Sequence, residues 1–268
     1  MKSLKDSINE TILSRKFSDP KLLVIKEWLE EYGIENYSIN SDYEIDVDGD
    51  VIIGSNSIKE FPSYIQFGIV QGHFLCGNCN LTSLRGCPRV VNKNFSCSLN
   101  NLTSLEGAPE KVGGYFYCNN NKLTSLKGVP KKIKGDFLCI DNELVTLKGA
   151  PEKVEGYFNC NKNKLTSLEG APKDVGASFY CSSNNLKDLK GAPEKVEGDF
   201  ICSFNNLTSL EGAPKKVGID FICSHNKLTS LEGAPKDVEG DFYCDYNSTK
   251  FTKDEVWKVS NVKGMISL

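Results

Sequence analysis

The segment Val112–Lys132 reads VGGYFYCNNNKLTSLKGVPKK, and close copies of it follow one another along most of the chain. Eight of the ten prolines recur every 21 residues, from Pro88 to Pro235. Nine cysteines recur with the same period: Cys76, Cys97, Cys118, Cys139, Cys160, Cys181, Cys202, Cys223 and Cys244. A fixed period in this range is typical of a solenoid, a fold in which each unit packs mainly against its neighbours.

The first half of the unit has the pattern of a β-strand with one buried face. Val112, Gly114, Phe116 and Cys118 alternate with residues that we expect to face solvent. Asn121 follows, and we expect it to turn inward and to hydrogen-bond backbone groups that would otherwise be buried without partners. The Gly and Pro near the end of the unit mark a return segment that is too short for a long helix.

Four residues of the unit match a known consensus. Phe116, Cys118, Asn121 and Leu123 fall on the second Leu, third Leu, Asn/Cys and final Leu of L-x-x-L-x-L-x-x-N/C-x-L. Over about residues 51–248 the chain therefore resembles the leucine-rich repeat family, most closely its short bacterial forms. The resemblance implies an α/β-type repeat solenoid with mainly parallel strands on its concave face and turn-like returns. The first consensus position differs, because the apolar residue lies one place earlier, so we expect the strand to begin differently.

Both ends of the repeat array differ from its middle, as expected for a solenoid whose apolar ends need caps. We predict a helical and hairpin cap with a degenerate first repeat at 1–72. The solenoid proper is predicted at 73–248. A C-terminal capping helix is predicted at 249–268.

At the N-terminal end, Asp19 and Pro20 have the N-cap and N1 arrangement of a helix start, and Gly33 is a natural stop. The dipeptide Asp48-Gly49 predicts a β-hairpin turn. A weaker preceding helix is predicted from the apolar residues Leu4, Ile8 and Ile12.

At the C-terminal end, Thr252 and Glu255 have the spacing of a capping box and predict a short helix. We expect this helix to lay Val256, Trp257 or Val259 over the last repeat. Such a cover would shield the open end from pairing with another molecule.

The composition and the net charge argue against several classes of function. The 268 residues include 32 Lys and Arg against 35 Asp and Glu, a net charge of −3, which argues against non-specific binding to nucleic acid. No apolar run approaches the roughly 20 residues that span a bilayer, and the first residues lack the apolar core of a secretory signal. We therefore expect a cytoplasmic protein that engages neither nucleic acid nor membrane.

The eleven cysteines are expected to be reduced, because no export signal accompanies them. In the repeated strand position they are interpreted as small hydrophobic core residues. Cys76, Cys79 and Cys87, with His73 nearby, leave a zinc site open as an alternative. The interpretation as repeat residues is favoured, since Cys79 stands where other units carry Asn and Cys87 stands in the Gly-Ala-Pro turn.

No catalytic pattern is present in the sequence. His73 and His225 are the two histidines of the chain, and neither belongs to a nucleophile or metal signature. The acidic run from Asp42 to Asp50 lacks the glycine position of a calcium loop. We predict a protein that is not an enzyme and uses no cofactor.

If the inward positions are structural, function is expected in the outward positions of the strands. Tyrosine and aliphatic side chains beside acidic ones suit a protein-binding surface, whereas the alternative is that these residues are simply good strand formers. The predicted protein-binding residues are Tyr115, Tyr117, Tyr157, Tyr180, Asp199, Ile201, Phe204, Asp220, Ile222, Asp241, Tyr243 and Tyr246.

The acidic members of this set suggest the partner's chemistry. Asp199, Asp220 and Asp241 recur in one position of successive units, so in a parallel stack they would lie about 5 Å apart. Like charges at that spacing repel one another, and the sequence shows no reason for the fold to accept that cost. The prediction is a protein partner that carries Lys or Arg next to an apolar patch.

The units and their leader also resemble repeat proteins encoded by large tailed bacteriophages. This resemblance implies a viral protein that engages a host protein through its concave face in the host cytoplasm. One alternative is a structural component of a virion or scaffold. A second is a metal-binding or enzymatic protein centred on the first repeat.

Overall fold

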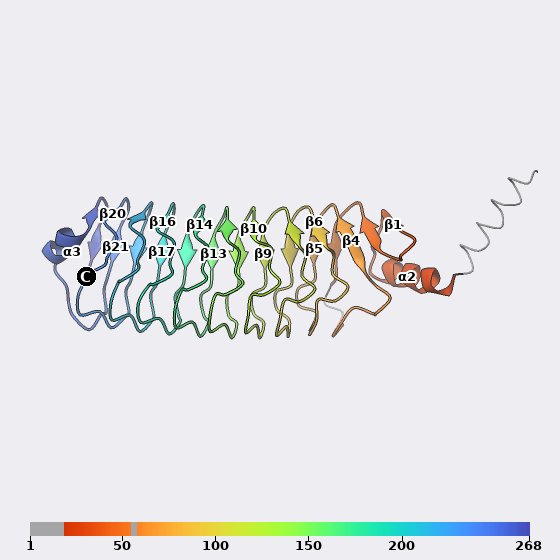
Figure 1. Ribbon diagram of the computed structural model, residues 1–268, viewed down its shortest axis with the longest axis horizontal. Coiled ribbons are helices and arrows are strands. Elements are labelled where there is room, and N and C mark those ends of the chain that lie inside the picture. The colour runs from red at the N-terminus through yellow and green to blue at the C-terminus, as the bar shows by residue number, and fades with distance from the viewer. Residues whose placement is uncertain (1–18, 55–57) are drawn as a thin grey trace, which may run out of the picture.

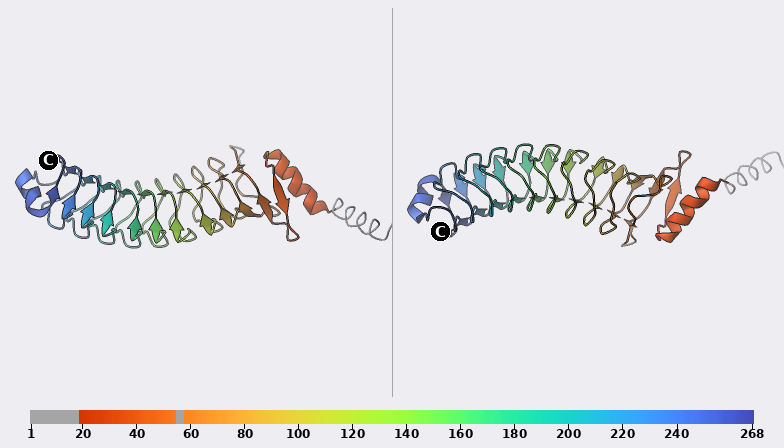
Figure 2. Two further views of the ribbon diagram at one scale, coloured as in Figure 1. Left: turned by 90° about the horizontal axis from the view of Figure 1, so that it is seen from above. Right: turned by 90° about the horizontal axis from the view of Figure 1, so that it is seen from below.

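The computed structural model describes residues 19–54 and 58–268. Their chain winds into a long parallel β-solenoid in which each turn stacks on the one before it (Figure 1). The predicted 21-residue repeat is confirmed, since Phe137 pairs with Phe116 on one side and Phe158 on the other. Figure 2 shows that the rod is gently bowed. The helix predicted from Leu4, Ile8 and Ile12 lies outside the described residues.

Each turn carries two short strands where the sequence predicted one. In the unit of Val112, β8 (Lys111–Val112) and β9 (Phe116–Tyr117) are separated by a bend. Gly114 lies in this bend, where a Cβ atom would come within 2.0 Å of the side-chain oxygen of Asn94 in the preceding turn. The prediction of a single strand was wrong. Both strands turn their apolar residues inward, so the alternation of buried and exposed residues continues through the bend and does not reveal it.

The strands that contain the repeated phenylalanine, here called the Phe strands, form an 11-stranded sheet with β3 and β23 within the described residues. Neighbouring strands pair in parallel, with Phe opposite Phe throughout the repeats. Besides β9, its members are β3 (Val51–Ile52), β5 (Phe74–Leu75), β7 (Phe95–Ser96), β11 (Phe137–Leu138), β13 (Phe158–Asn159), β15 (Phe179–Tyr180), β17 (Phe200–Ile201), β19 (Phe221–Ile222), β21 (Phe242–Tyr243) and β23 (Ile266–Ser267).

The strands that carry the repeated valine form the second side of the solenoid. In the described part of the chain they divide into sheets of five, three and four strands, the first of which includes β1 and β2. Besides β8, they are β4 (Phe67–Val70), β6 (Val90–Val91), β10 (Lys132–Ile133), β12 (Lys153–Val154), β14 (Asp174–Val175), β16 (Lys195–Val196), β18 (Lys216–Val217), β20 (Asp237–Val238) and β22 (Asn261–Val262).

The core repeats the same five side chains in every regular turn. Val154, Phe158, Cys160, Leu165 and Leu168 are fully buried, and their equivalents above and below are buried with them. The phenylalanine rings stack along the axis; for example, the ring centroids of Phe158 and the next phenylalanine lie 5.1 Å apart. Burial of this continuous apolar column is the main source of stability.

The inward asparagines form the predicted ladder. Asn121 donates through Nδ2 to the carbonyl oxygens of Cys97 and Cys118, at 3.0 and 3.2 Å, and its side-chain oxygen accepts the N–H of Leu102 at 3.0 Å. The same bonds recur at Asn142, Asn163, Asn184, Asn205 and Asn226. Each asparagine thus joins two turns by pairing buried backbone groups of both.

Between residues 76 and 249 the return segments contain turns and no helix, so the α/β description holds only in part. Among the described residues the helices are α2 (Pro20–Glu31) and α3 (Lys253–Val259), which lie at opposite ends of the rod (Figure 1). Neither helix combines the length and apolar character needed to cross a membrane, in the described part of the chain.

The N-terminal helix begins as predicted, with Asp19 accepting the N–H groups of Lys21 and Leu22. The hairpin is present but not at Asp48-Gly49. It joins β1 (Tyr37–Ile39) to β2 (Ile45–Val47), which pair antiparallel. Gly49 instead lies at the corner between β2 and β3, where its carbonyl accepts the N–H of Gly72 in the next turn at 2.8 Å. The dipeptide Asp48-Gly49, which is typical of a hairpin turn, therefore forms a corner of the solenoid.

At the C-terminal end, the capping box of Thr252 and Glu255 is present and starts α3. Val256 is buried as predicted, whereas Trp257 is 58% exposed and does not cover the last repeat. After α3 the chain adds β22 and β23 to the two sides of the solenoid. The helix occupies the return segment of this last turn.

The buried cysteines lead to a prediction about thiol chemistry and stability. Cys160 donates from Sγ to the carbonyl oxygen of Tyr180 at 3.4 Å, and burial raises the pKa of its thiol well above the ordinary value. Cys160→Ala should therefore lower the free energy of unfolding by about 1 to 2 kcal/mol. In the native protein the thiols of the repeated cysteines should react slowly with a thiol reagent. Rapid modification of most of them would contradict their burial in the core.

Candidate protein-binding surface

An apolar row runs along the outer face of the Phe-strand sheet near its C-terminal end. It consists of Tyr180, Ile201, Ile222 and Tyr243, each of which directly follows the buried phenylalanine of its strand. The four residues are paired in register across β15, β17, β19 and β21, so they are immediate neighbours along the rod. The structure thus brings together the four predicted residues of this row.

The acidic row Asp199, Asp220 and Asp241 lies beside the apolar row, two residues earlier in each strand. Each carboxylate accepts a backbone N–H of the next turn at the corner: Asp220 N–H donates to Asp199 at 3.2 Å, and Asp241 N–H donates to Asp220 at 2.7 Å. Met265 N–H donates to Asp241 at 2.7 Å. The expectation that the fold has no use for these side chains was wrong, because each carboxylate accepts a corner N–H group.

The same corner bond recurs with other acceptors. Asn94 accepts the N–H of Tyr115 at 3.0 Å, Asp136 that of Tyr157 at 2.9 Å, and Ser178 that of Asp199 at 2.9 Å. The bond therefore needs an acceptor and not a negative charge. This second ladder was missed in the sequence, although the column of Asp, Asn and Ser residues three places before the cysteine was its signal.

A second row of exposed side chains is an aromatic stack of Phe204, His225 and Tyr246. The ring centroids of Phe204 and His225 lie 4.3 Å apart and those of His225 and Tyr246 4.4 Å apart, with interplanar angles of 10° in both pairs. Phe204 and Tyr246 are 57% and 76% exposed. The sequence predicted the outer two residues as binding residues, and the structure adds His225 between them.

The stack stands at a left-handed turn position of the repeat. All three residues have positive φ, 55° at Phe204, 56° at His225 and 53° at Tyr246. Bulky side chains rarely adopt this conformation, whereas Asn and Asp tolerate it. Other units place residues of several kinds at this position with φ between 53° and 57°: Asn78, Leu99, Asn120, Asp141, Lys162 and Ser183.

The remaining predicted tyrosines lie nearer the middle of the rod. Tyr115 and Tyr117 stack at 3.8 Å, and the Tyr117 hydroxyl donates to Asp136 at 3.3 Å. Burial, together with that nearby carboxylate, raises the pKa of Tyr117 to about 12. The ring of Tyr157 lies 6.2 Å from that of Tyr180 and so extends the apolar row toward the middle of the rod.

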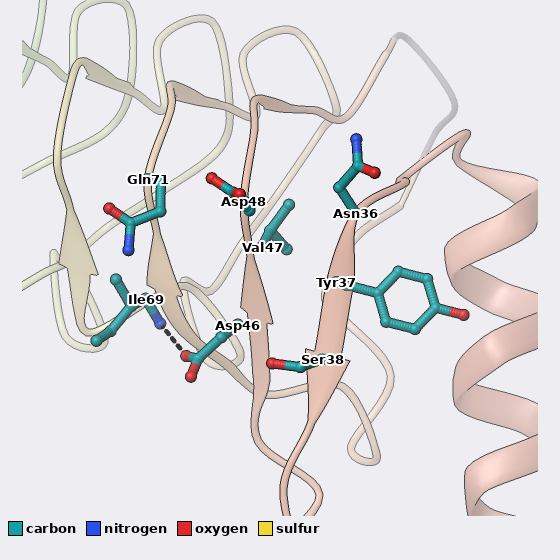
Figure 3. Close-up of a pocket in the computed structure, with 8 residues that line it drawn as sticks. All are labelled: Asn36, Tyr37, Ser38, Asp46, Val47, Asp48, Ile69 and Gln71. Atoms are coloured by element: carbon teal, nitrogen blue, oxygen red, sulfur yellow. Dashed lines mark hydrogen bonds between the residues drawn. The ribbon is translucent and has the colours of Figure 1, made fainter.

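A shallow pocket of about 460 Å³ lies at the other end of the rod, over β1, β2 and β4 (Figure 3). Its polar lining includes Asp46 and Asp48, but Asp46 is already used by the N–H of Ile69, which donates to it at 2.7 Å. The ring of Tyr37 points away from the pocket centre toward α2.

The three cysteines of the first repeat are buried. Cys79 donates from Sγ to the carbonyl oxygens of Ile53 and Gly54, both at 3.3 Å, and burial raises its pKa to about 11. Among the described residues no group of three or more His, Cys, Asp or Glu side chains is placed to hold a metal ion.

Comparisons of the chain with models of protein families, with curated proteins and with solved structures found no match.

Proposed function

We propose that the protein is a non-enzymatic protein-binding solenoid of the leucine-rich-repeat type. Its binding surface consists of the apolar row, the acidic row and the aromatic stack on the outer face of the Phe-strand sheet. The observation that carries the proposal is the apolar row, four large side chains in register across adjacent strands. Amphipathic aromatic and aliphatic anchors of this kind are typical of interface centres.

The partner proposed for this surface is a protein with an apolar patch and neighbouring Lys or Arg side chains. The acidic row supports this chemistry, because its three carboxylates lie beside the apolar row while they accept N–H groups. Complementary charges at the rim of an interface mainly raise the association rate. In keeping with the repeat style, we place the protein in a host cytoplasm as a bacteriophage product that engages a host protein.

Charge and apolar contact can be tested separately at this surface. Asp220→Lys is unsuitable, because it would remove the corner acceptor along with the charge. The triple variant Asp199→Asn, Asp220→Asn and Asp241→Asn keeps the corner acceptors, as Asn94 does in its own turn. It replaces the carboxylate oxygens that accept from the hydroxyls of Tyr180 and Tyr243. With a partner recovered from cells, it should slow association about tenfold at low salt, measured by surface plasmon resonance.

The matched variant for the apolar row is Ile201→Asn with Ile222→Asn, since Asn159 occupies the same row position in β13. It should weaken binding at least about tenfold, mainly through faster dissociation. Circular dichroism and the urea midpoint serve as folding controls. Unchanged affinity for both variants, with folding intact, would place the binding site elsewhere on the rod.

A structural role in a virion or scaffold is the second candidate, favoured by the long rod of stacked turns (Figure 1). In that case affinity purification should recover virion proteins, and the asparagine variants should leave their recovery unchanged.

A further inference from the structure

We infer that the partner docks through a basic amphipathic α-helix that lies along the axis of the rod. This inference rests on the proposed function and specifies the shape, direction and charge of the docking element. It follows from the spacing of the rows, from the pairing of the backbone, and from the chemistry on each side of the apolar row.

The direction follows from how the rows are built. Each row takes one residue from successive turns, as Ile201 is paired with Ile222 and Ile222 with Tyr243. The rows therefore run across the strands and along the rod. With neighbouring strands about 4.8 Å apart, the four side chains of the apolar row span about 14 Å.

The shape follows from matching this spacing. An α-helix returns to the same face about every 5.4 Å, so four successive apolar side chains span about 16 Å. An extended strand presents same-face side chains about every 6.7 Å and spans about 20 Å. The apolar side chains of a helix therefore stay close to those of the row along its whole length. The last side chain of an extended strand would be displaced from the row by more than one turn of the solenoid.

The backbone of the surface points to the same shape. In this region the Phe strands are paired on both sides; for example, Cys202 N–H donates to Ile222 O at 2.8 Å and Cys223 N–H donates to Tyr243 O at 2.9 Å. No strand edge is open within the face for an added β-strand. An extended segment lying on it would leave its own N–H and C=O groups without backbone partners, while a helix pairs them internally.

The aromatic stack adds a second apolar ridge beside the apolar row. Phe204 and Tyr246 are largely exposed, and the His225 ring stacks between theirs. Ser203, Ser224 and Asp245 stand between this stack and the apolar row in successive turns. Both serines are buried, and Asp245 accepts the hydroxyls of Ser224 and Ser267 at 3.2 and 2.8 Å, so an apolar helix ridge can contact both rows.

The charge of the helix follows from the acidic row, which lies on the side of the apolar row away from the aromatic stack. Asp199, Asp220 and Asp241 form an uninterrupted acidic row there. A helix whose Lys or Arg residues lie on one flank of its apolar stripe places them against these carboxylates. The basic flank also fixes the orientation, because the other flank then meets the aromatic stack.

The test uses a designed probe of about four helical turns. The peptide is hydrocarbon-stapled, with Leu once per turn and Lys along one flank. Two matched peptides accompany it: an unstapled isomer with Leu at alternate positions, and a stapled peptide with Glu in place of Lys. Each is titrated against the full chain by fluorescence anisotropy.

The helical Lys peptide should bind at least about tenfold more tightly than either matched peptide. Its affinity should fall about tenfold with Ile201→Asn and Ile222→Asn, and again with Phe204→Asn and Tyr246→Asn. Leu99→Asn, a substitution at the equivalent turn position far from the surface, should change nothing. A helical peptide that binds no better than its alternating isomer, or that binds the asparagine variants equally well, overturns the inference.

The two proposals can fail separately. If the asparagine variants lose a cellular partner while the helical peptide shows no preference, the proposed function stands and the helical docking mode falls. If both the cellular partner and the peptide ignore these variants, the surface itself is not the binding site.

Discussion

Asn163→Ala should lower the free energy of unfolding by about 3 kcal/mol, one of the two largest effects expected for a single substitution in this protein. The Asn163 side chain is buried and makes four hydrogen bonds. Its oxygen accepts the N–H of Leu144 at 3.1 Å, and Nδ2 donates to the carbonyl oxygens of Cys139, Cys160 and Asn161 at 3.0 to 3.2 Å. Alanine would leave these buried groups without that partner.

The matched control is Asn161→Ala in the same turn. Asn161 accepts one bond through its side chain, from the N–H of Ser182, in a partly buried position. The loss of stability should therefore be smaller than for Asn163→Ala by more than about 1 kcal/mol. Urea denaturation of both variants measures the difference, and equal small effects would show that Asn163 does not hold the turns together.

The ladder and the core could be predicted from the sequence because their residues recur. Phe116, Cys118 and Asn121 keep their spacing in every regular unit, and a fixed spacing fixes which side chains stack on which. Parallel pairing with Phe opposite Phe follows directly from that repetition. The corner between the two strands could not be predicted in the same way, because Val112 and Phe116 both point inward on either side of the bend and preserve the alternation.

The residues of the binding surface could be predicted from the sequence, but their hydrogen bonds and backbone conformation could not. Ile201, Ile222 and Tyr243 were placed in one row by the period alone. The role of Asp220 in the fold was missed, because its hydrogen-bond partner is a backbone N–H of the next turn and the column of Asp, Asn and Ser was its one signal in the sequence. The left-handed conformation of Phe204 was also missed, because Leu99 and Lys162 at the same place in other units weaken the signal that Asn120 and Asp141 give.

On the outer face, the corner acceptors stabilise the fold, while the charges and apolar side chains are available to a partner. At the corners, Asp, Asn and Ser are interchangeable because each provides one acceptor, as Asn94, Ser178 and Asp199 show. Asp at three successive corners gives the same corner bond as Asn or Ser, and the second carboxylate oxygens of Asp199 and Asp241 also accept the hydroxyls of Tyr180 and Tyr243. The corner bond itself does not require the negative charge, which is available to a partner.

The return segments depend on a different feature, the glycine of the Gly-Ala-Pro turn. Gly170 has φ +91°, and a Cβ atom built on it would lie 2.8 Å from the backbone carbon of Leu147 and from the backbone nitrogen of Lys148. These atoms belong to the preceding turn of the solenoid and are held by its own stacking. Glycine is thus required here twice, by its own φ and by the close approach of the neighbouring backbone.

Gly170→Ala should consequently lower the free energy of unfolding by at least about 3 kcal/mol, because strain and collision act together. Gly33→Ala separates the two contributions: Gly33 also has a positive φ, +62°, but a Cβ atom there would meet nothing within 4 Å. Its cost should be about 1 kcal/mol, that of the backbone conformation alone. The measurement is the shift of the urea midpoint for both variants, with hydrogen exchange in the adjacent turns as a local readout. If Gly170→Ala costs no more than Gly33→Ala, the turns are not packed as closely at their return segments as the stack requires.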